Sequence, residues 1–436
     1  MSHTRIYYPE DRIPLTRLIP MGMQHVVAMF GATILAPILM GFNPQVALFF
    51  SGIGTLLFIV ITGAKVPSYL GSSFAFIGPV LAVTGGDAAK IPLALSGIAG
   101  AAVLYAVTAL ITMRWGPNWI DRLMPPVVTG SVVAIIGLNL ASSAVTNAIN
   151  ADLTVNSFTD LTRLTIATAT FLTAAGVAIY LKGFLRLLPI LIGVIVGYTL
   201  FVLVGMLDSQ SVAHIRSAVW LGLPPFQKPA FSLNALLVIA PIFIVLVAEN
   251  KGHIAAISGY LGGDLNPHQG RAYLGDALAT FVSALGGGTP QTTYAENMGV
   301  MAITRVYSTS NFIVAACIAI LLGLCPKIGA FIQSIPNPVL GGITIILYGL
   351  ITLMGIGIWI DAKVDFSNHK NLVVAGASLV AATGLGIKGL TVAGTNIAGI
   401  AFGTLLALIL NLCLSIGGTP SGRHEPGVEE PCHPQA

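Results

Sequence analysis

Long apolar segments recur along almost the whole chain, from Met21 to Leu414, with only short polar breaks between them. Apolar runs of about 15 to 23 residues are long enough to cross a lipid bilayer as helices. The pattern predicts an all-α polytopic membrane protein with no soluble domain. We expect fourteen membrane-spanning segments, near residues 18–40, 45–63, 69–84, 91–113, 122–145, 164–182, 184–206, 231–250, 271–287, 289–304, 308–326, 337–357, 371–387 and 393–415.

Composition agrees with this pattern and excludes several functions. Hydrophobic residues make up 55% of the chain and charged residues only 8%, whereas soluble domains carry about 25% charged residues. The net charge of +4 is small and spread over loops, which argues against a nucleic-acid partner. The four cysteines have neither metal-ligand nor disulfide spacing. We therefore expect no metal and no cofactor.

The distribution of positive charge predicts the orientation. When the N-terminus is placed inside the cell, most of the 20 Lys and Arg residues fall in cytoplasmic loops, as the positive-inside rule requires. An even number of crossings then places both termini on the cytoplasmic side of the inner membrane. The polar, proline-rich C-terminal tail is expected to be disordered.

Two pairs of segments reveal an internal repeat. Residues Pro126–Leu138 (PVVTGSVVAIIGL) align without a gap with Pro338–Leu350 (PVLGGITIILYGL), and Ser72–Val80 (SSFAFIGPV) aligns with Thr292–Val300 (TTYAENMGV). The members of each pair are seven spans apart. Because seven is odd, the second half must enter the membrane from the opposite side. This 7+7 inverted repeat is typical of secondary transporters, whose binding sites lie near the bilayer midplane.

The third and tenth spans are short and irregular. Residues 72–76 and 292–296 alternate small, β-branched and aromatic side chains, which favours short extended strands. Exposed backbone at membrane depth needs hydrogen-bond partners, so the two strands are expected to pair with each other. The half-helices that follow would present backbone N–H groups to a ligand.

Ionisable side chains within apolar spans are the strongest functional candidates. Glu249, Asp276 and Glu296 lie inside or at the edge of such spans, where an ionised group is costly. Glu249 and His253 are four residues apart and so share a helical face, and together they form a candidate proton-coupling pair. For Asp276, we favour a structural hydrogen bond with a polar neighbour.

Four further residues are weaker candidates. His25 lies near an apolar face, where a hydrogen bond between helices is as plausible as a direct role in binding. Phe76 and Tyr294 belong to the irregular segments, and Tyr348 interrupts an aliphatic run. For each, packing in the core is the alternative to contact with a ligand.

A signature in the tenth span points to a known family. The residues Glu296, Asn297, Gly299, Thr304 and Arg305 form a polar residue followed by Asn-x-Gly-x4-Thr-Arg. This pattern resembles the signature of the nucleobase–ascorbate transporters, also called nucleobase–cation symporters of the second kind. Nearly the whole chain resembles this family. The flanking sequences YLGSSFAFIGP and LVAENKGH are most similar to those of bacterial uracil permeases and pyrimidine-utilisation permeases.

The resemblance implies a homodimer with a core domain and a gate domain, and with short antiparallel strands in spans 3 and 10. The implied boundaries are a cytoplasmic tail at 1–17, core segments at 18–115 and 231–327, gate segments at 116–230 and 328–418, and a C-terminal tail at 419–436.

The resemblance also implies roles for individual residues. Glu249 and Glu296 would contact a pyrimidine ring, the backbone N–H groups of Phe76 and Ala295 would donate to its carbonyls, and His253 would hydrogen-bond to Glu249. Tyr294 and Tyr348 would line the pocket. Ala295 departs from the glycine of uracil permeases; its N–H is retained, but its methyl group crowds the site.

These observations predict proton-coupled symport of a neutral pyrimidine nucleobase, most simply uracil. The alternative within the family is a purine carrier for xanthine or urate, although such carriers tend to have Gln at the position of Glu296. An anion transporter of similar fold is a more distant alternative, which two acidic residues in the site argue against. No catalytic motif of a membrane enzyme is present in the sequence.

Overall fold

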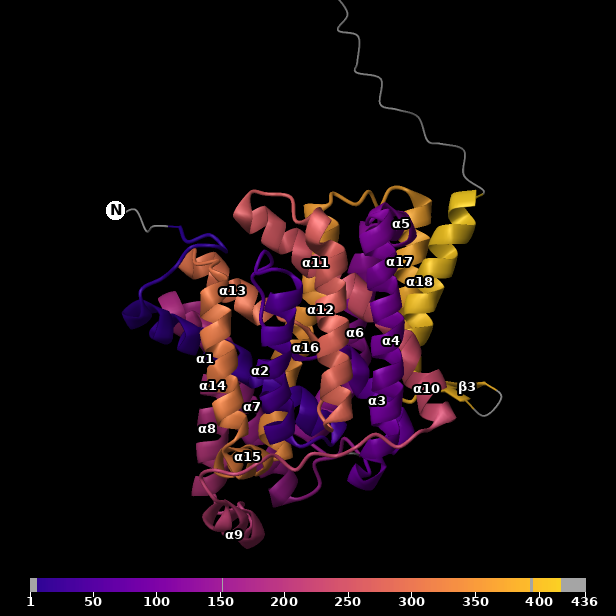
Figure 1. The fold of residues 1–436 in the computed structure, drawn as a ribbon. Coiled ribbons are helices and arrows are strands. Elements are labelled where there is room, and N and C mark those ends of the chain that lie inside the picture. The colour runs from indigo at the N-terminus through magenta and orange to yellow at the C-terminus, as the bar shows by residue number, and fades with distance from the viewer. Residues whose placement is uncertain (1–5, 151, 393–394, 417–436) are drawn as a thin grey trace, which may run out of the picture.

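The computed structural model describes residues 6–150, 152–392 and 395–416; the predicted tail at 419–436 lies outside them. Helices dominate both halves of the chain (Figure 1). The first half contains α1 (Leu15–Met40), α2 (Pro44–Ile61), β1 (Leu70–Ser72), α3 (Ile77–Thr84), α4 (Ile91–Trp115), α5 (Asn118–Leu123), α6 (Pro126–Ala148), α7 (Phe158–Tyr180), α8 (Pro189–Leu203) and α9 (Ser209–Ser217). The second half contains α10 (Leu233–Ile239), α11 (Phe243–Leu261), α12 (Gln269–Leu285), β2 (Gln291–Thr293), α13 (Ala295–Thr304), α14 (Thr309–Gly323), α15 (Pro326–Gln333), α16 (Asn337–Asp361), α17 (His369–Leu385), β3 (Leu390–Val392), β4 (Thr395–Ile397) and α18 (Gly399–Ile416).

Many of the helices are apolar enough to lie in a bilayer. Within the described residues, seven helical segments are long and apolar enough to cross a membrane, and the bent pair α14 and α15 would make an eighth. The chain is therefore a multi-pass membrane protein. The count of fourteen crossings stays a prediction.

The helices pack as two bundles. The strand bundle contains α1 to α4 and α10 to α14, in which α4 packs on α12 and α2 packs on α14. The α6 bundle contains α6 to α8 and α16 to α18, in which α6 packs on α16, α17 and α18. Helix α11 contacts both α12 and α6 and thus lies at the border between the bundles.

Helices α6 and α16, which carry the repeated PVVTG and PVLGG sequences, pack against each other with their backbones in close approach. A Cβ atom added to Gly130, near the start of α6, would meet the carbonyl oxygen of Gly355, near the end of α16, at 2.6 Å. At the other end of the pair, a Cβ on Gly341 would meet Ala148. The two helices are therefore antiparallel, as an inverted repeat requires, and small residues permit the contact.

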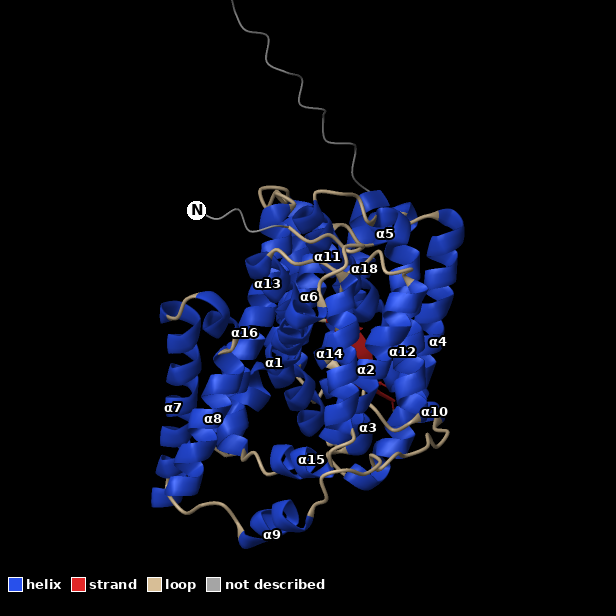
Figure 2. Cartoon of the chain, turned by 60° about the vertical axis from the view of Figure 1, so that its left-hand side comes forward, coloured by secondary structure: helices blue, strands red, loops and turns tan. Residues whose placement is uncertain are grey.

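The two short strands β1 and β2 lie inside the helical body, where β1 contacts α2 and β2 contacts α12 (Figure 2). They pair antiparallel, with Leu70 opposite Thr293 and Ser72 opposite Gln291. The strands begin slightly earlier in the chain than the predicted runs at 72–76 and 292–296. After Ser72 the chain turns into a 3-10 turn instead of continuing as a strand, because the Ser73 side chain accepts a hydrogen bond from the Ala75 N–H.

One helix extends beyond the span predicted at 231–250. Helix α11 continues to Leu261, past Glu249, Asn250 and Lys251. The prediction stopped the span at these polar residues, but the side chains of Asn250 and Lys251 have hydrogen-bond partners within the protein.

Candidate functional site

The strand pair is held in place by side-chain hydroxyl groups. Thr55 of α2 accepts a hydrogen bond from the Leu70 N–H at 2.9 Å. Thr280 of α12 bonds to both the N–H and the carbonyl of Gln291, each at 3.0 Å. Because extended backbone in an apolar interior must satisfy its polar groups, these two threonines allow the strands to exist at this depth.

A helix begins shortly after each strand. Phe76 is the N-cap residue of α3, and Ala295 is the first residue of α13. Tyr294, the N-cap of α13, makes no side-chain capping bond. Both of the residues predicted to donate a backbone N–H therefore lie at helix N-termini, where N–H groups and the helix dipole favour an electron-rich ligand atom.

Two carboxyl groups lie beside the strands. Glu249 of α11 is half-buried near the hydroxyl groups of Ser73 and Thr292, and its Oε2 atom is buried with no hydrogen-bond partner in the described part of the chain. Glu296 lies in the first turn of α13, is also half-buried, and hydrogen-bonds to its own backbone N–H. The two groups are close enough to repel each other when both are ionised. The structure therefore brings together the two acidic residues that the sequence singled out.

His253 lies one turn beyond Glu249 and is buried. Its Nδ1 atom is 2.7 Å from the Thr293 hydroxyl oxygen in β2. The resemblance implied a hydrogen bond to Glu249 instead; among the described residues, the bond recorded for His253 is the one to Thr293. The path of α11 brings His253 toward β2, where the Thr293 hydroxyl is its hydrogen-bond partner.

The two candidate tyrosines differ in their surroundings. The Tyr294 ring packs over Gly71 of β1, and its hydroxyl donates to the Ser72 carbonyl at 3.0 Å, so the side chain fixes the strand pair. Tyr348 comes from α16 of the other bundle and meets Phe74 edge to face, with ring centroids 6.3 Å apart. Its buried hydroxyl has no hydrogen-bond partner among the described residues. Tyr348 is the candidate contributed by the α6 bundle.

His25 and Asn297 hold two helices together. The Asn297 amide donates to the His25 carbonyl at 3.1 Å and lies 3.1 Å from its Nδ1 atom. The His25 ring also packs against Phe312, with centroids 4.5 Å apart. These contacts join α1, α13 and α14, and they give both candidates a structural role.

The end of the signature motif terminates helix α13. The Thr304 hydroxyl donates to the Val300 carbonyl at 2.8 Å, and Arg305 takes a left-handed conformation with φ of +56°. Thr304 lies eight positions after Glu296 on the helix, which corresponds to about 12 Å along the axis. The carbonyl of Arg305 accepts the Tyr7 N–H at 3.2 Å. These residues therefore position α13 rather than contact the carboxyl pair.

Asp276 is fully buried on α12, and its Oδ2 atom accepts the Asn250 amide at 2.6 Å. Among the residues that the structure describes, its Oδ1 atom has no hydrogen-bond partner. The polar neighbour that pairs with Asp276 is therefore Asn250, the residue directly after Glu249.

Sequence reasoning missed several residues of this region. Ser73 and Thr292 lie within the irregular segments, so the segments themselves were the available signal. Asn250 follows Glu249 directly, but which neighbour its side chain meets depends on the path of α11. The Thr293 contact joins residues 40 positions apart, which no local pattern reveals.

The chain matches known permeases along most of its length. The model of the Permease family matches residues 16–392. A protein of Escherichia coli (strain K12) named pyrimidine permease RutG is 46% identical over 422 residues, covering 95% of this chain and 93% of that protein. The uracil permease of Bacillus caldolyticus is 41% identical over 417 residues, covering 93% and 94% respectively. The uracil permease of Escherichia coli (strain K12) is 39% identical over 416 residues, covering 93% of each chain.

Solved structures share the fold at low sequence identity. The transmembrane domain of a cyanobacterial bicarbonate transporter, BicA, matches with a TM-score of 0.62 at 16% identity, covering 94% of this chain and all of that one. The murine solute carrier 26 family member A9 anion transporter, in its inward-facing state, matches with a TM-score of 0.63 at 11% identity, covering 94% of this chain and 69% of that one. These likenesses concern the fold alone. From its signature motif and its curated relatives, this chain belongs to the Permease family, as the resemblance to the nucleobase–ascorbate transporters predicted.

Proposed function

We propose that this permease carries a neutral pyrimidine nucleobase, with uracil as its substrate, together with a proton across the cytoplasmic membrane by alternating access. The observation that carries the proposal is the position of two half-buried carboxyl groups, Glu249 and Glu296, beside a strand pair and two helix N-termini. The relatives named uracil and pyrimidine permeases support this substrate class.

The chemistry of the site suits an uncharged base. Uracil alternates N–H donors with carbonyl acceptors, so the carboxyl oxygens of Glu249 and Glu296 would accept from its N–H groups. The backbone N–H groups of Phe76 and Ala295, at the starts of their helices, would donate to its carbonyls. Two acidic residues would repel an anion, which makes anion transport the weaker reading of the shared fold.

Aromatic side chains would form the walls of the site. Phe74 and Tyr348 meet edge to face across the border between the bundles, and either ring would pack against a planar base. Tyr294 would contribute indirectly, because it fixes the strands from which the backbone donors emerge.

Proton coupling follows from the lack of charge on the substrate. Accumulation of a neutral base against a gradient requires a protein group that gains and loses a proton during the cycle. Glu249 is suited to this task because its buried Oε2 atom makes no hydrogen bond to any described residue. His253, hydrogen-bonded to Thr293 one turn away, would pass the proton onward.

In this proposal, the two bundles would be the two domains that the family resemblance implies. The strand bundle would be the core domain, built from 18–115 and 231–327, and the α6 bundle would be the gate domain, built from 116–230 and 328–418. Movement of one against the other would expose the site alternately to each side of the membrane. Both termini would face the cytoplasm, and the protein would act as a homodimer.

The direct test is uptake of labelled uracil into proteoliposomes that contain the purified protein. We expect Glu296→Ala to abolish uptake while Glu10→Ala, which removes an exposed carboxyl group, leaves uptake unchanged. Undiminished uptake by Glu296→Ala would remove Glu296 from the site.

Competition by unlabelled uracil, thymine, xanthine and ascorbate then identifies the substrate. We expect uracil to compete most strongly. Stronger competition by xanthine than by uracil would favour the purine alternative.

A further inference from the structure

The turn between α5 and α6 exposes a row of backbone carbonyls. Pro125 and Pro126 follow one another there, and neither has an N–H to donate. The Pro125 carbonyl accepts backbone N–H groups of α6, whereas side chains bond other carbonyls on either side of it. Asn411 of α18 lies 3.5 Å from the Leu123 carbonyl, and Trp359 of α16 donates to the Val127 carbonyl at 3.1 Å.

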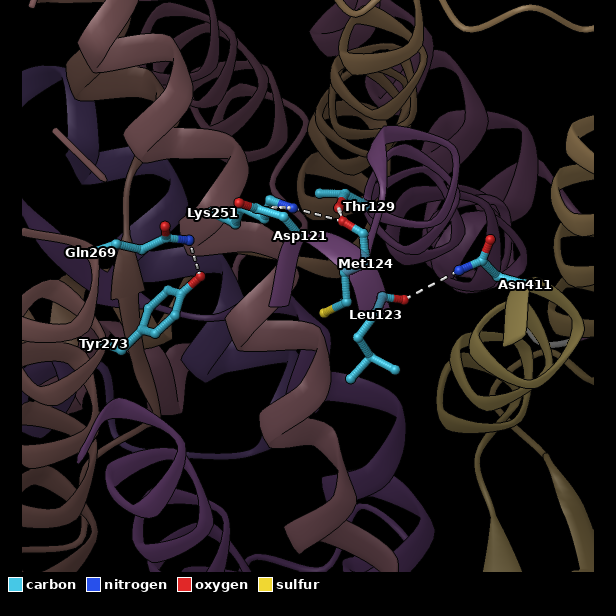
Figure 3. Close-up of polar contacts among 8 residues, drawn as sticks. All are labelled: Asp121, Leu123, Met124, Thr129, Lys251, Gln269, Tyr273 and Asn411. Atoms are coloured by element: carbon cyan, nitrogen blue, oxygen red, sulfur yellow. Dashed lines mark hydrogen bonds and ion pairs between the residues drawn. The ribbon is translucent and has the colours of Figure 1, made fainter. Parts of the chain in front are cut away.

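Lys251 is bonded to the same turn (Figure 3). Its Nζ atom donates to the Met124 carbonyl at 2.7 Å and forms an ion pair with Asp121 Oδ1 at 2.8 Å. Thr129 donates to the same Met124 carbonyl at 3.1 Å. The turn thus receives Asn411, Trp359 and Thr129 from the α6 bundle, but Lys251 from the border helix α11.

The location of Lys251 gives this contact its significance. It lies two residues after Glu249 on α11, so the helix that carries the carboxyl group is tied to the start of α6. The turn lies at the same end of the molecule as the first and last described residues (Figure 1). A relative movement that opened the border between the bundles at this end would have to break the contact.

A surface lysine that only reaches solvent would look different. Lys65 offers the comparison: it forms an exposed ion pair with Glu10, and the two side chains are 46% and 71% exposed. The Lys251 side chain is only 18% exposed, and its ammonium group has both a carboxylate and a carbonyl partner. Bonds of this kind are stronger than exposed ion pairs.

We propose that Lys251, held by Asp121 and the Met124 carbonyl, is a latch that stabilises the conformation closed at the end of the molecule where the termini lie. This inference rests on the proposed transport cycle. Release of the latch would accompany opening of the site toward that side. Because Lys251 lies two residues after Glu249 on the same helix, changes at the Glu249 carboxyl group would be coupled to the border between the bundles.

The test measures opening without any substrate. Ile358 of α16 covers the border beside the latch, because a Cβ on Gly252 of α11 would lie 3.1 Å from its Cδ1 atom. An Ile358→Cys substitution, in the full chain with its four native cysteines replaced by alanine, is labelled with a membrane-impermeant maleimide. We expect Lys251→Met to raise the labelling rate about tenfold, the worth of one charge-assisted hydrogen bond.

Two further variants separate a latch from a merely structural residue. Lys251→Arg keeps the charge and the donors, and it should label at the parental rate. Lys65→Met removes the exposed ion pair and should leave labelling unchanged. If Lys251→Met fails to fold, Asp121→Asn removes the ion pair alone and should raise labelling to a smaller extent.

Binding of labelled uracil to the same variants distinguishes the latch from the proposed function. Parental labelling of Lys251→Met in a protein that binds uracil overturns the latch and leaves the transport proposal standing. Raised labelling in a protein that binds no nucleobase supports the latch and overturns the transport proposal. Equal increases in labelling for Lys251→Met and Lys65→Met would also overturn the latch.

Discussion

A single methyl group added to strand β1 should disrupt the candidate site. In a Gly71→Ala variant, the new Cβ would lie 2.5 Å from Cε2 and 2.7 Å from the hydroxyl oxygen of Tyr294. Ordinary contacts begin at 3.4 Å, so the ring would have to retreat by about 1 Å. Such overpacking costs about 1–3 kcal/mol.

The retreat would also weaken the hydrogen bond from Tyr294 to the Ser72 carbonyl, worth about 1 kcal/mol. The total is about 2–4 kcal/mol against the paired strands. If the strands separate to relieve the clash, the binding-competent fraction falls by at most about 30- to 700-fold, and apparent uracil affinity falls with it.

Equilibrium binding of labelled uracil to purified protein measures this effect, with the melting temperature recorded in parallel. The matched control is Gly78→Ala in α3, where the new Cβ would meet Asn139 at an ordinary 3.6 Å. We expect parental binding from this control, because alanine is tolerated well in a helix. Parental affinity and melting temperature for Gly71→Ala would refute the reasoning.

Two further predictions concern buried polar residues. His253→Ala should preserve uracil binding, because the hydrogen bond from His253 to Thr293 is not part of the carboxyl pair. The variant should lose the dependence of uracil accumulation on the pH gradient, and equal proton-driven accumulation by variant and parent would contradict a role of His253 in proton transfer. Asn250→Ala should destabilise the protein by about 1–3 kcal/mol, because buried Asp276 loses its amide donor. Thermal unfolding measures this effect. Asn311→Ala is the control, since the Asn311 amide has no hydrogen-bond partner among the described residues, and equal shifts in melting temperature for the two variants would count against the prediction.

The sequence predicted the general architecture because bilayer-length apolar runs and repeated segments are local signals. The antiparallel contact between Gly130 and Gly355 has the direction that the aligned PVVTG and PVLGG sequences require. The positions of the strands were harder to predict from the sequence. Alternation at 72–76 favoured a strand there, whereas the strand pair depends on Gly71, whose lack of a side chain makes room for Tyr294.

The candidate site was predicted in part. Glu249 and Glu296 stood out because acidic residues are costly in apolar spans, and the structure places them near each other. The partners of His253 and Lys251 could not be predicted, because Thr293 and Asp121 lie far away in the sequence. Local spacing identifies which side chains share a helical face, but it does not identify what that face meets.

The close packing of α6 on α16 restricts how this transporter can move. Gly137 of α6 and Gly341 of α16 leave no space for even a methyl group between the two helices, because the backbone of the partner fills it. Sliding one helix along the other would force larger side chains into these positions. The two helices should therefore move as one rigid unit during the transport cycle, and the strand bundle should carry the substrate past them.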